Sequence, residues 1–159
     1  MAVDMFLKLG KIKGESKDDK HGGEIDVLAW SWGASQSGSF GSGGGGGAGK
    51  ANVQDLSVTK WIDASSASLL THCVTGEHIP EALLTVRKAG KNPLEYLKIK
   101  LKKVLITSIS TGGSGGEDRL TENISLNFGH VTFEYMIQKD DGTGEAGGTS
   151  TYDVEKNKQ

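Results

Sequence analysis

A glycine-rich segment in the first third of the chain comes nearest to a known binding motif. Residues 44–51 read GGGGAGKA, which matches the phosphate-binding loop G-x-x-x-x-G-K-[ST] at every position but the last. That position is Ala51, which has no hydroxyl group to hold a magnesium ion. The residues that follow predict a strand, whereas the motif needs a helix whose N-terminus receives the phosphates. The segment therefore indicates a flexible surface or contact loop.

Cysteine and histidine side chains do not form a convincing metal or nucleophile site. Cys73 lies beside His72, and His78 follows five residues later. Zinc ligands come in spaced pairs, and adjacent residues on a helix point about 100° apart, so His72 and Cys73 do not easily bind one ion. A Cys73 nucleophile paired with His130 is an alternative that nothing in the sequence favours. A buried cysteine and surface histidines are expected.

Two pairs of neighbouring carboxylates, Glu117-Asp118 and Asp140-Asp141, stand in glycine-flanked turns. A glycosidase needs two carboxylates that face each other across a cleft, whereas adjacent turn residues usually lie in water. No G-x-S-x-G sequence leads into a predicted helix, as a serine nucleophile elbow would require. The sequence thus predicts that the protein is not an enzyme and that it uses no cofactor and no metal.

A basic run, Lys98, Lys100, Lys102 and Lys103, gives one predicted strand a charged face. One interpretation is an edge strand, on which lysines prevent unwanted pairing with other strands. The other interpretation is a polar contact between subunits.

Length and composition favour one soluble domain. The chain has 159 residues, a net charge of -2 and one cysteine, so it can build a core but not an intrachain disulfide. The near-balance of charge argues against nucleic-acid binding as the main task, although a local basic patch stays compatible with it. Asp4 and Lys8 interrupt any signal-peptide core, and no apolar run approaches the ~18 residues of a membrane span. We expect synthesis in a reducing cytoplasm, and any export by a route without a cleaved signal.

Alternating apolar and polar residues predict about six or seven strands, which favours a compact barrel or sandwich. Val131, Phe133 and Tyr135 alternate in the opposite parity to the preceding residues, and the switch at Gly129 and His130 indicates a β-bulge or a break between strands. The predicted strands cover residues 3–9, 24–32, 56–62, 82–88, 97–106, 124–128 and 131–135.

One helix is predicted over residues 63–74, with Asp63 capping its start and Gly76 ending it. Its apolar face is expected to hold Leu69, Leu70, Cys73 and Val74. Residues 139–159 are polar, and we expect a loose C-terminal tail after a domain of residues 1–138.

The second predicted strand holds two tryptophans. Its alternation places Trp30 and Trp32 on one face together with Leu28, so we expect the tryptophans to anchor the core. Ala29, Ser31 and Gly33 then form a small, weakly polar opposite face, which another copy of the chain could complete.

Several segments together resemble the hemolysin-coregulated protein (Hcp) family, the tube proteins of bacterial type VI secretion systems. The resemblance covers about residues 1–138, in order and at the right spacing. It departs from the family after Gln138, at Met136-Ile137 before that glutamine, and at Ala67 near the helix start. The segments are residues 1–8 (MAVDMFLK), 13–16 (KGES), 24–33 (EIDVLAWSWG), 35–38 (SQSG), 43–50 (GGGGGAGK), 53–56 (VQDL), 87–90 (RKAG), 95–97 (EYL), 110–123 (STGGSGGEDRLTEN) and 126–128 (LNF).

This resemblance implies a mainly β fold, a two-sheet β-barrel with one short α-helix on its side, that assembles as a hexameric ring. Rings of this family stack into the inner tube of a contractile secretion apparatus, are fired out of the cell and carry small effectors in the lumen. The implied partners are five further copies of the chain, stacked rings, spike, sheath and baseplate components and small effector proteins. Nucleic acid and membrane insertion are not expected.

Two sets of residues are candidates for these contacts. Ser31 and Ala29 are expected to line the lumen and to touch cargo. The glycine-rich loop is expected to contact a neighbouring subunit or a stacked ring, through Gly43, Gly44, Gly45, Gly46, Gly47, Gly49 and Lys50. The alternative to a ring subunit is a monomeric β-barrel that binds a small ligand such as a carbohydrate.

Overall fold

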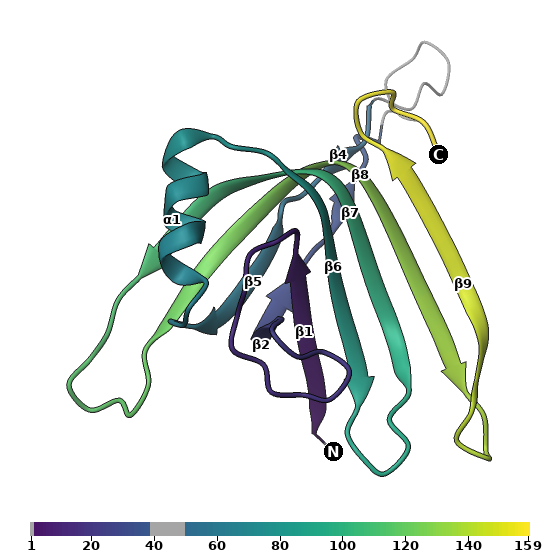
Figure 1. The fold of residues 1–159 in the computed structure, drawn as a ribbon. Helices are drawn as coiled ribbons and strands as arrows, with labels where there is room; N and C mark the ends of the chain where they lie inside the picture. The colour runs from purple at the N-terminus through teal and green to yellow at the C-terminus, as the bar shows by residue number, and fades with distance from the viewer. Residues whose placement is uncertain (1, 39–49) are drawn as a thin grey trace.

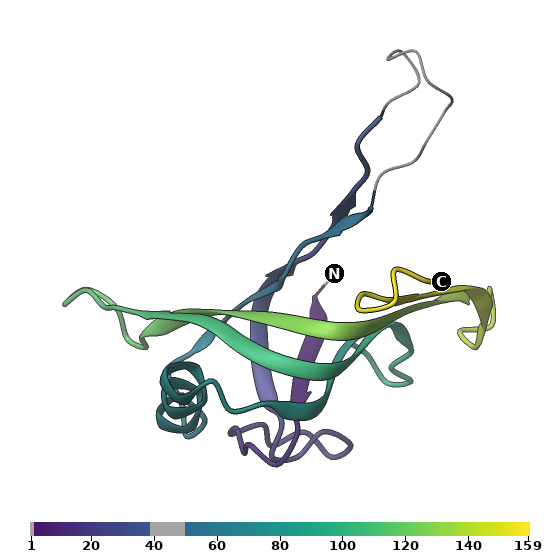
Figure 2. The same cartoon turned by 90° about the horizontal axis from the view of Figure 1, so that it is seen from above.

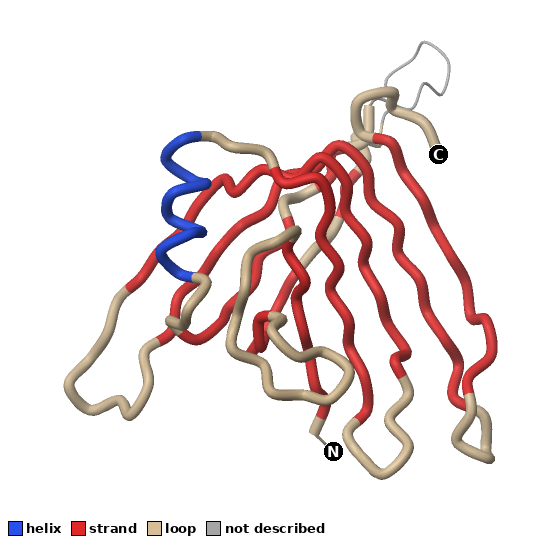
Figure 3. Tube along the Cα trace, in the orientation of Figure 1, coloured by secondary structure: helices blue, strands red, loops and turns tan. Residues whose placement is uncertain are grey.

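The computed structural model describes residues 2–38 and 50–159 and is built mainly of β-strands (Figures 1 and 3). The single helix within these residues is α1 (Ser66–Thr75). The strands are β1 (Val3–Leu9), β2 (Ile25–Ser31), β3 (Ala34–Ser35), β4 (Asn52–Val53), β5 (Leu56–Trp61), β6 (Ile79–Lys88), β7 (Glu95–Thr111), β8 (Thr121–Gln138) and β9 (Gly144–Asp153).

Six strands close into a barrel, which is the architecture that the family resemblance implied. The strand order is β5-β2-β1-β6-β7-β8-β9, and β5 pairs additionally with the first half of β8, from Leu56↔Leu126 to Trp61↔Thr121. The second half of β8 pairs on the same edge with β9 instead. One side of the barrel is therefore a sheet of β1, β6, β7, β8 and β9, and the other is a sheet of β2, β5, β8 and β7.

The long strands β7 and β8 pass from one sheet to the other through a shared corner. Leu101 pairs with Val131 and Val104 with Phe128, and all four are buried, although the two buried residues on each strand are an odd number of positions (three) apart. The backbone at the corner is bent, since Lys103 has φ 55 and stands beside Gly129, where an added Cβ would lie 3.2 Å from the Lys103 Cβ. Such bends let strands switch sheets.

The parity switch at Gly129 and His130 is thus neither a β-bulge nor a strand break. The register between β7 and β8 stays constant through this point, and its one shift lies further along, between Ile106 and Ser108. The prediction was wrong because a bend shared by two paired strands changes the inward face of both without adding a residue to either.

Buried aliphatic side chains fill the barrel. Residues such as Leu7, Leu9, Leu84 and Ile99 have 0% exposure, and each stands at an inward position of its strand. At about 25 cal/mol per Å² of apolar surface removed from water, this core is the main stabilising contribution. It occupies the space that a ligand-binding barrel would leave open.

Helix α1 packs on the barrel through a narrower face than its sequence predicted. Leu69 is fully buried and Cys73 half-buried, whereas Leu70 and Val74 are 53% and 74% exposed. The helix ends at Gly76, whose left-handed φ of 70° lets its N–H donate to the carbonyl of His72. Asp63 lies before the helix and accepts a 2.8 Å hydrogen bond from the Ser65 N–H. No helix in the described part of the chain is both long and apolar enough to cross a membrane.

The expectation of a loose tail after residue 138 was wrong for most of it. Gly144–Asp153 forms β9, which pairs with β8 from His130↔Asp153 to Gln138↔Gly144. Beyond β9, the Val154 N–H donates to the carbonyl of Gly129, and Glu155 binds Lys103 at 2.8 Å. An apolar pattern that would predict β9 is lacking, because most residues of this strand are exposed and its hydrogen bonds come from the backbone.

An arm leaves the barrel after β2. This arm is the antiparallel pair of β3 and β4, joined by Ala34↔Val53 and Ser35↔Asn52, and the pair projects away from the barrel in Figure 2. The predicted contact residues Gly43, Gly44, Gly45, Gly46, Gly47 and Gly49 lie outside the described residues. Lys50 is described and exposed, and the chain then enters β4, so a strand and not a helix follows the glycine run.

Candidate functional site

The course of β2 decides which of its side chains face outward. The pairing of β2 with β5 shifts between Val27 and Ala29, so Val27 is buried while Leu28 is 38% exposed. The prediction that Leu28 shares an inward face with the tryptophans was therefore wrong. Trp30 and Trp32 are half-buried and pack against the core cluster. Ala29, by contrast, is exposed.

Ser31 and Ala29 belong to two rows of small side chains that cross four strands. Directly paired residues point to the same side of a sheet, so strand register defines each row. The two rows together are called the small polar face. The first row is Ser31, Ser57, Ser125 and Ser108, and the second is Ala29, Thr59, Asn123 and Ser110.

The small polar face is uncharged and holds hydrogen bonds between its own members. The Thr59 hydroxyl donates to the Asn123 side-chain oxygen at 2.6 Å, and Ser108 and Ser125 share a hydroxyl contact. Six of its eight residues are exposed and the other two are partly exposed. Serine hydroxyls without a neighbouring histidine or lysine are not activated as nucleophiles. This surface is suited to wide, weak contact with water or protein.

The arm is fixed at the border of the small polar face. The Trp32 indole N–H donates to the carbonyl of Gln54 at 2.9 Å, and the Trp32 ring stacks against Phe133 at 6.2 Å. Asp55 accepts hydrogen bonds from the Asn127 amide at 2.9 Å and the Thr107 hydroxyl at 2.7 Å. These contacts set the direction in which the arm leaves the barrel.

A buried ionic cluster lies inside the barrel, at the foot of α1. Lys60 and Glu122 are both 0% exposed and form an ion pair. The Lys60 ammonium also lies 3.1 Å from Asp63 and donates to the carbonyl of Trp61 at 2.8 Å. Ser66, in the first turn of α1, donates to the same Glu122 oxygen at 2.6 Å. The cluster therefore ties β5, β8 and α1 together.

Sequence reasoning did not find this cluster, although a signal was present. On β5, Lys60 follows Leu56 and Val58 at the next inward position. On β8, Glu122 stands at the inward position before Ile124 and Leu126. A lysine and a glutamate at inward positions of two strands indicate a buried pair, because neither is buried alone.

A second ionic cluster holds the loop of residues 10–24 over β1 and β6. The Arg87 guanidinium binds both carboxylate oxygens of Asp18 and lies 4.9 Å from the centre of the Phe6 ring. His21 also stacks on the Phe6 ring, with the ring centres 4.4 Å apart, and its ring nitrogens lie 2.9 Å from Glu24 and 2.7 Å from Glu95. The loop is thus a fixed part of the barrel surface.

These contacts shift the acidities of two carboxyls. The hydrogen bond from Arg87 holds the pKa of Asp18 below its usual value. Burial by itself would raise the pKa of Glu95, but the hydrogen bond from His21 and the nearby Lys98 charge outweigh it, so that pKa is lowered. Both carboxylates are therefore ionised at neutral pH and act as permanent anchors.

The reactive residues noted in the sequence remain apart. His72 lies 3.6 Å from Glu77, and no group of three or more metal-binding side chains occurs in residues 2–38 and 50–159. Glu117, Asp118, Asp140 and Asp141 are all exposed. The structure brings none of these side chains together as a catalytic site would need.

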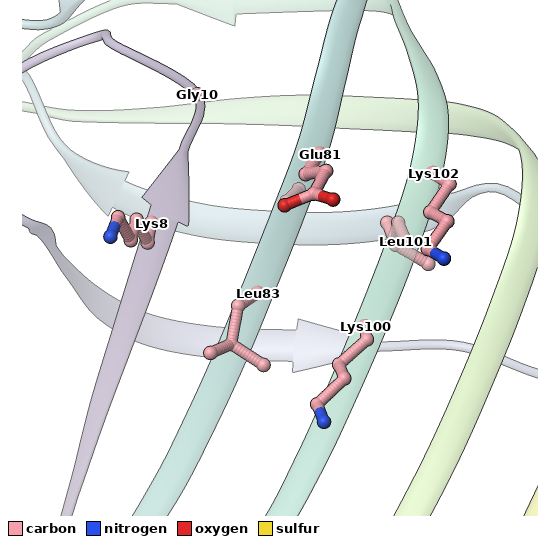
Figure 4. Close-up of a pocket in the computed structure, with 8 residues that line it drawn as sticks. Lys8, Gly10, Glu81, Leu83, Lys100, Leu101 and Lys102 are labelled. Atoms are coloured by element: carbon pink, nitrogen blue, oxygen red, sulfur yellow. The ribbon is translucent and has the colours of Figure 1, made fainter.

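The lysine run lies on a central strand. β7 stands between β6 and β8, so the interpretation of these lysines as protection for a sheet edge was wrong. Lys100 and Lys102 instead line an open groove of about 380 Å³ on the outer face of β1, β6 and β7, with Lys8 and Glu81 around it (Figure 4). Lys103 lies outside the groove, bound to Glu155 at 2.8 Å.

Comparison with known proteins agrees with the fold and with the resemblance. A family model described as "Type VI secretion system effector, Hcp" matches residues 6–135. The chain is 64% identical over 148 residues to Protein hcp1 of Pseudomonas aeruginosa, across 92% of this chain and 91% of that protein. Hcp1 from Salmonella typhimurium has a TM-score of 0.82 at 40% identity, with 99% of each chain covered. A structure of a type six secretion system protein has a TM-score of 0.92 at 34% identity, again with 99% of each chain covered. The chain therefore belongs to the Hcp family of type VI secretion system proteins.

Proposed function

We propose that this protein is the ring-forming subunit of a type VI secretion tube. Six copies associate head to tail into a ring, rings stack into a conduit, and small effector proteins are held in the lumen. The tube is assembled in the cytoplasm and leaves the cell without a cleaved signal peptide. Spike, sheath and baseplate components are its further partners, and the subunit itself performs no catalysis.

The small polar face is the observation that carries this proposal. A conduit wall has to hold cargo without trapping it, so its surface should offer hydrogen bonds but few charges and no large apolar patch. Two rows of serine, threonine, asparagine and alanine side chains across four strands meet that requirement. We place the lumen on this face, with Ser31 and Ala29 among the residues that contact cargo.

The monomeric ligand-binding barrel is not favoured. Such a protein needs an enclosed, mainly apolar cavity. Here aliphatic side chains of 0% exposure, Leu7, Leu9, Leu84 and Ile99 among them, occupy the barrel centre. The groove of Figure 4 is open to solvent and carries three lysines.

The first test of the proposal is the mass of the purified protein in solution. The monomer is 16.8 kDa, so light scattering coupled to size exclusion should give about six times that mass, and negative-stain images should show annuli. A clean monomer at tens of micromolar would contradict the proposed function.

A second test addresses the lumen. Ser31→Tyr places a large ring on the small polar face, and we expect the ring to assemble but to lose its co-purifying effector. Thr71→Tyr is the matched control, because Thr71 is exposed on α1 and lies outside the small polar face. Retention of the effector by Ser31→Tyr in intact rings would place the lumen elsewhere.

A further inference from the structure

The open groove on the outer face of β1, β6 and β7 is basic and is called the lysine groove. Figure 4 shows Lys8 from β1, Glu81 and Leu83 from β6, and Lys100 and Lys102 from β7 around it. Strand register sets Leu83 directly between Lys8 and Lys100, and Glu81 beside Lys102. Three ammonium groups therefore surround an apolar floor of strand residues.

The charges of the lysine groove are only partly neutralised. Lys100 lies 3.3 Å from Glu134 and is half exposed. Lys8 and Lys102 are exposed and have no ion-pair partner in the described part of the chain. Lysines at the edge of a sheet prevent pairing with another strand, but β1 and β7 are already paired on both sides. The exposed lysines are therefore not needed for that purpose, and this surface is available for an anionic partner.

The loop between β7 and β8 carries the opposite charge. Residues 111–120 are all exposed, and the loop protrudes beyond the ends of both strands, at the lower left of Figure 1. Glu117 and Asp118 lie in this loop, and neither carboxylate has a hydrogen-bond or ion-pair partner among residues 2–38 and 50–159. We call residues 112–120 the acidic loop.

The base of the acidic loop is fixed to the barrel. The Arg119 guanidinium lies 4.3 Å from the centre of the Trp61 ring, and the Ile62 N–H donates to the carbonyl of Leu120 at 2.8 Å. Leu120 also packs close to Gly113, where an added Cβ would lie 2.5 Å from a Leu120 methyl group. These contacts hold the base of the loop in place beneath two exposed acidic residues, and so they reduce the ordering that docking requires.

The acidic loop of one chain cannot fill the lysine groove of the same chain. β7 runs on from Lys102 to Thr111, which at ~3.3 Å per residue is about 30 Å of strand. Contact between the two surfaces therefore joins two copies. It is a head-to-tail contact, because it uses different surfaces on the two partners, and such contacts close into a ring when the rotation between neighbouring copies closes.

We propose that the acidic loop of each subunit docks in the lysine groove of the next subunit. This inference rests on the proposed ring and specifies one of its lateral contacts. Glu117 and Asp118 bind the ammonium groups of Lys8, Lys100 and Lys102, and the groove is large enough to receive both carboxylates. A contact of this kind adds direction and specificity to association more than raw affinity.

Zero-length cross-linking with a carbodiimide tests the contact in the unmodified protein. The reagent joins a carboxylate to an amine only where the two touch. We expect dimer-sized products whose digests contain Glu117 or Asp118 joined to Lys8, Lys100 or Lys102. Rings that yield cross-links only at other acidic residues, for example Asp140, would overturn the inference and leave the ring intact.

A charge exchange provides the second readout. We expect Lys102→Glu to raise the concentration at which half the rings dissociate by about tenfold or more, and Glu117→Lys to do the same. The variant that combines both changes should recover much of the wild-type value. Lys17→Glu is the control, because Lys17 is an exposed lysine outside the lysine groove.

The outcomes separate this inference from the proposed function. If the wild type forms rings and neither charge reversal weakens them, the docking is refuted and the proposal of a tube subunit stands. A wild-type protein that is monomeric throughout would refute the ring and the docking together. Weakening by each reversal without recovery in the combined variant would show that the two residues act in different contacts.

Discussion

The ion pair buried at the foot of α1 leads to the sharpest prediction on stability. Within residues 2–38 and 50–159, Lys60 is the only cation that forms an ion pair with Glu122 or Asp63, and these three side chains are 0–4% exposed. Replacing Lys60 by methionine keeps most of the side-chain volume but leaves two carboxylates facing each other without a positive charge. Removing one member of a buried pair costs about 3–5 kcal/mol, because the remaining charge stays buried.

The expected result follows from that cost. For a chain of this size, 1 kcal/mol lowers the melting temperature by about 2–4 °C, so Lys60→Met should lower it by roughly 10 °C. Replacing both partners, as Lys60→Met with Glu122→Leu, should restore much of the loss, since apolar replacements of both charges are often close to neutral. The coupling between the two changes should therefore exceed about 1 kcal/mol.

The measurement is denaturant and thermal unfolding at one fixed protomer concentration, because assembly itself adds apparent stability. Lys98→Met is the control, since Lys98 pairs with Glu95 at 3.5 Å on the surface and such pairs contribute about 0–1 kcal/mol. A loss for Lys60→Met no greater than that of Lys98→Met would refute the reasoning, as would a combined variant less stable than Lys60→Met alone.

Two further predictions concern α1 and the loop of residues 10–24. Leu69→Ala should lower the free energy of unfolding by about 2–5 kcal/mol, because Leu69 is the fully buried residue of the helix. Val74→Ala, at 74% exposure, should change it by less than about 0.5 kcal/mol in the same denaturant titration, and equal effects would mean that the helix packs through a different face. Arg87 lowers the folded-state pKa of Asp18, so this contact stabilises the fold fully above the usual carboxyl pKa of 3.8 and is lost as pH falls through the lower folded value. Asp18→Asn should therefore be less stable than the wild type at neutral pH, and the difference should shrink below about pH 4; a difference independent of pH would assign the effect to packing.

Several parts of the fold followed from the sequence because they depend on local patterns. The predicted strand at residues 3–9 is β1, and its alternation puts Leu7 and Leu9 in the core. Gly76 ends the helix as expected, since a left-handed residue there favours glycine. The same alternation made Ser31 an outward residue, and the ordered family segments identified the Hcp family.

Other features were decided by pairing between distant segments. β9 carries little apolar pattern, and it exists because the free edge of β8 offers backbone hydrogen bonds to it. Leu28 does not face inward as its strand pattern predicted, because the register between β2 and β5 shifts at this residue. The corner at Lys103 and Gly129 turns two paired strands at once, which no single-strand pattern reports.

For the candidate surfaces, the sequence by itself determined which residues are small, polar or charged, and which of them point outward along their own strand. Only the tertiary structure decided which of them meet. Ser31 joins Ser57, Ser125 and Ser108 because β5 closes the barrel against β8, more than 60 residues further along the chain. The lysines of β7 line a groove because β6 and β1 lie beside them, and Lys60 meets Glu122 across the same closure. The physical reason is that the direction of a side chain is a local property of its strand. Which side chains of different strands become neighbours depends on strand order and register, and these are determined by the packing of the whole core.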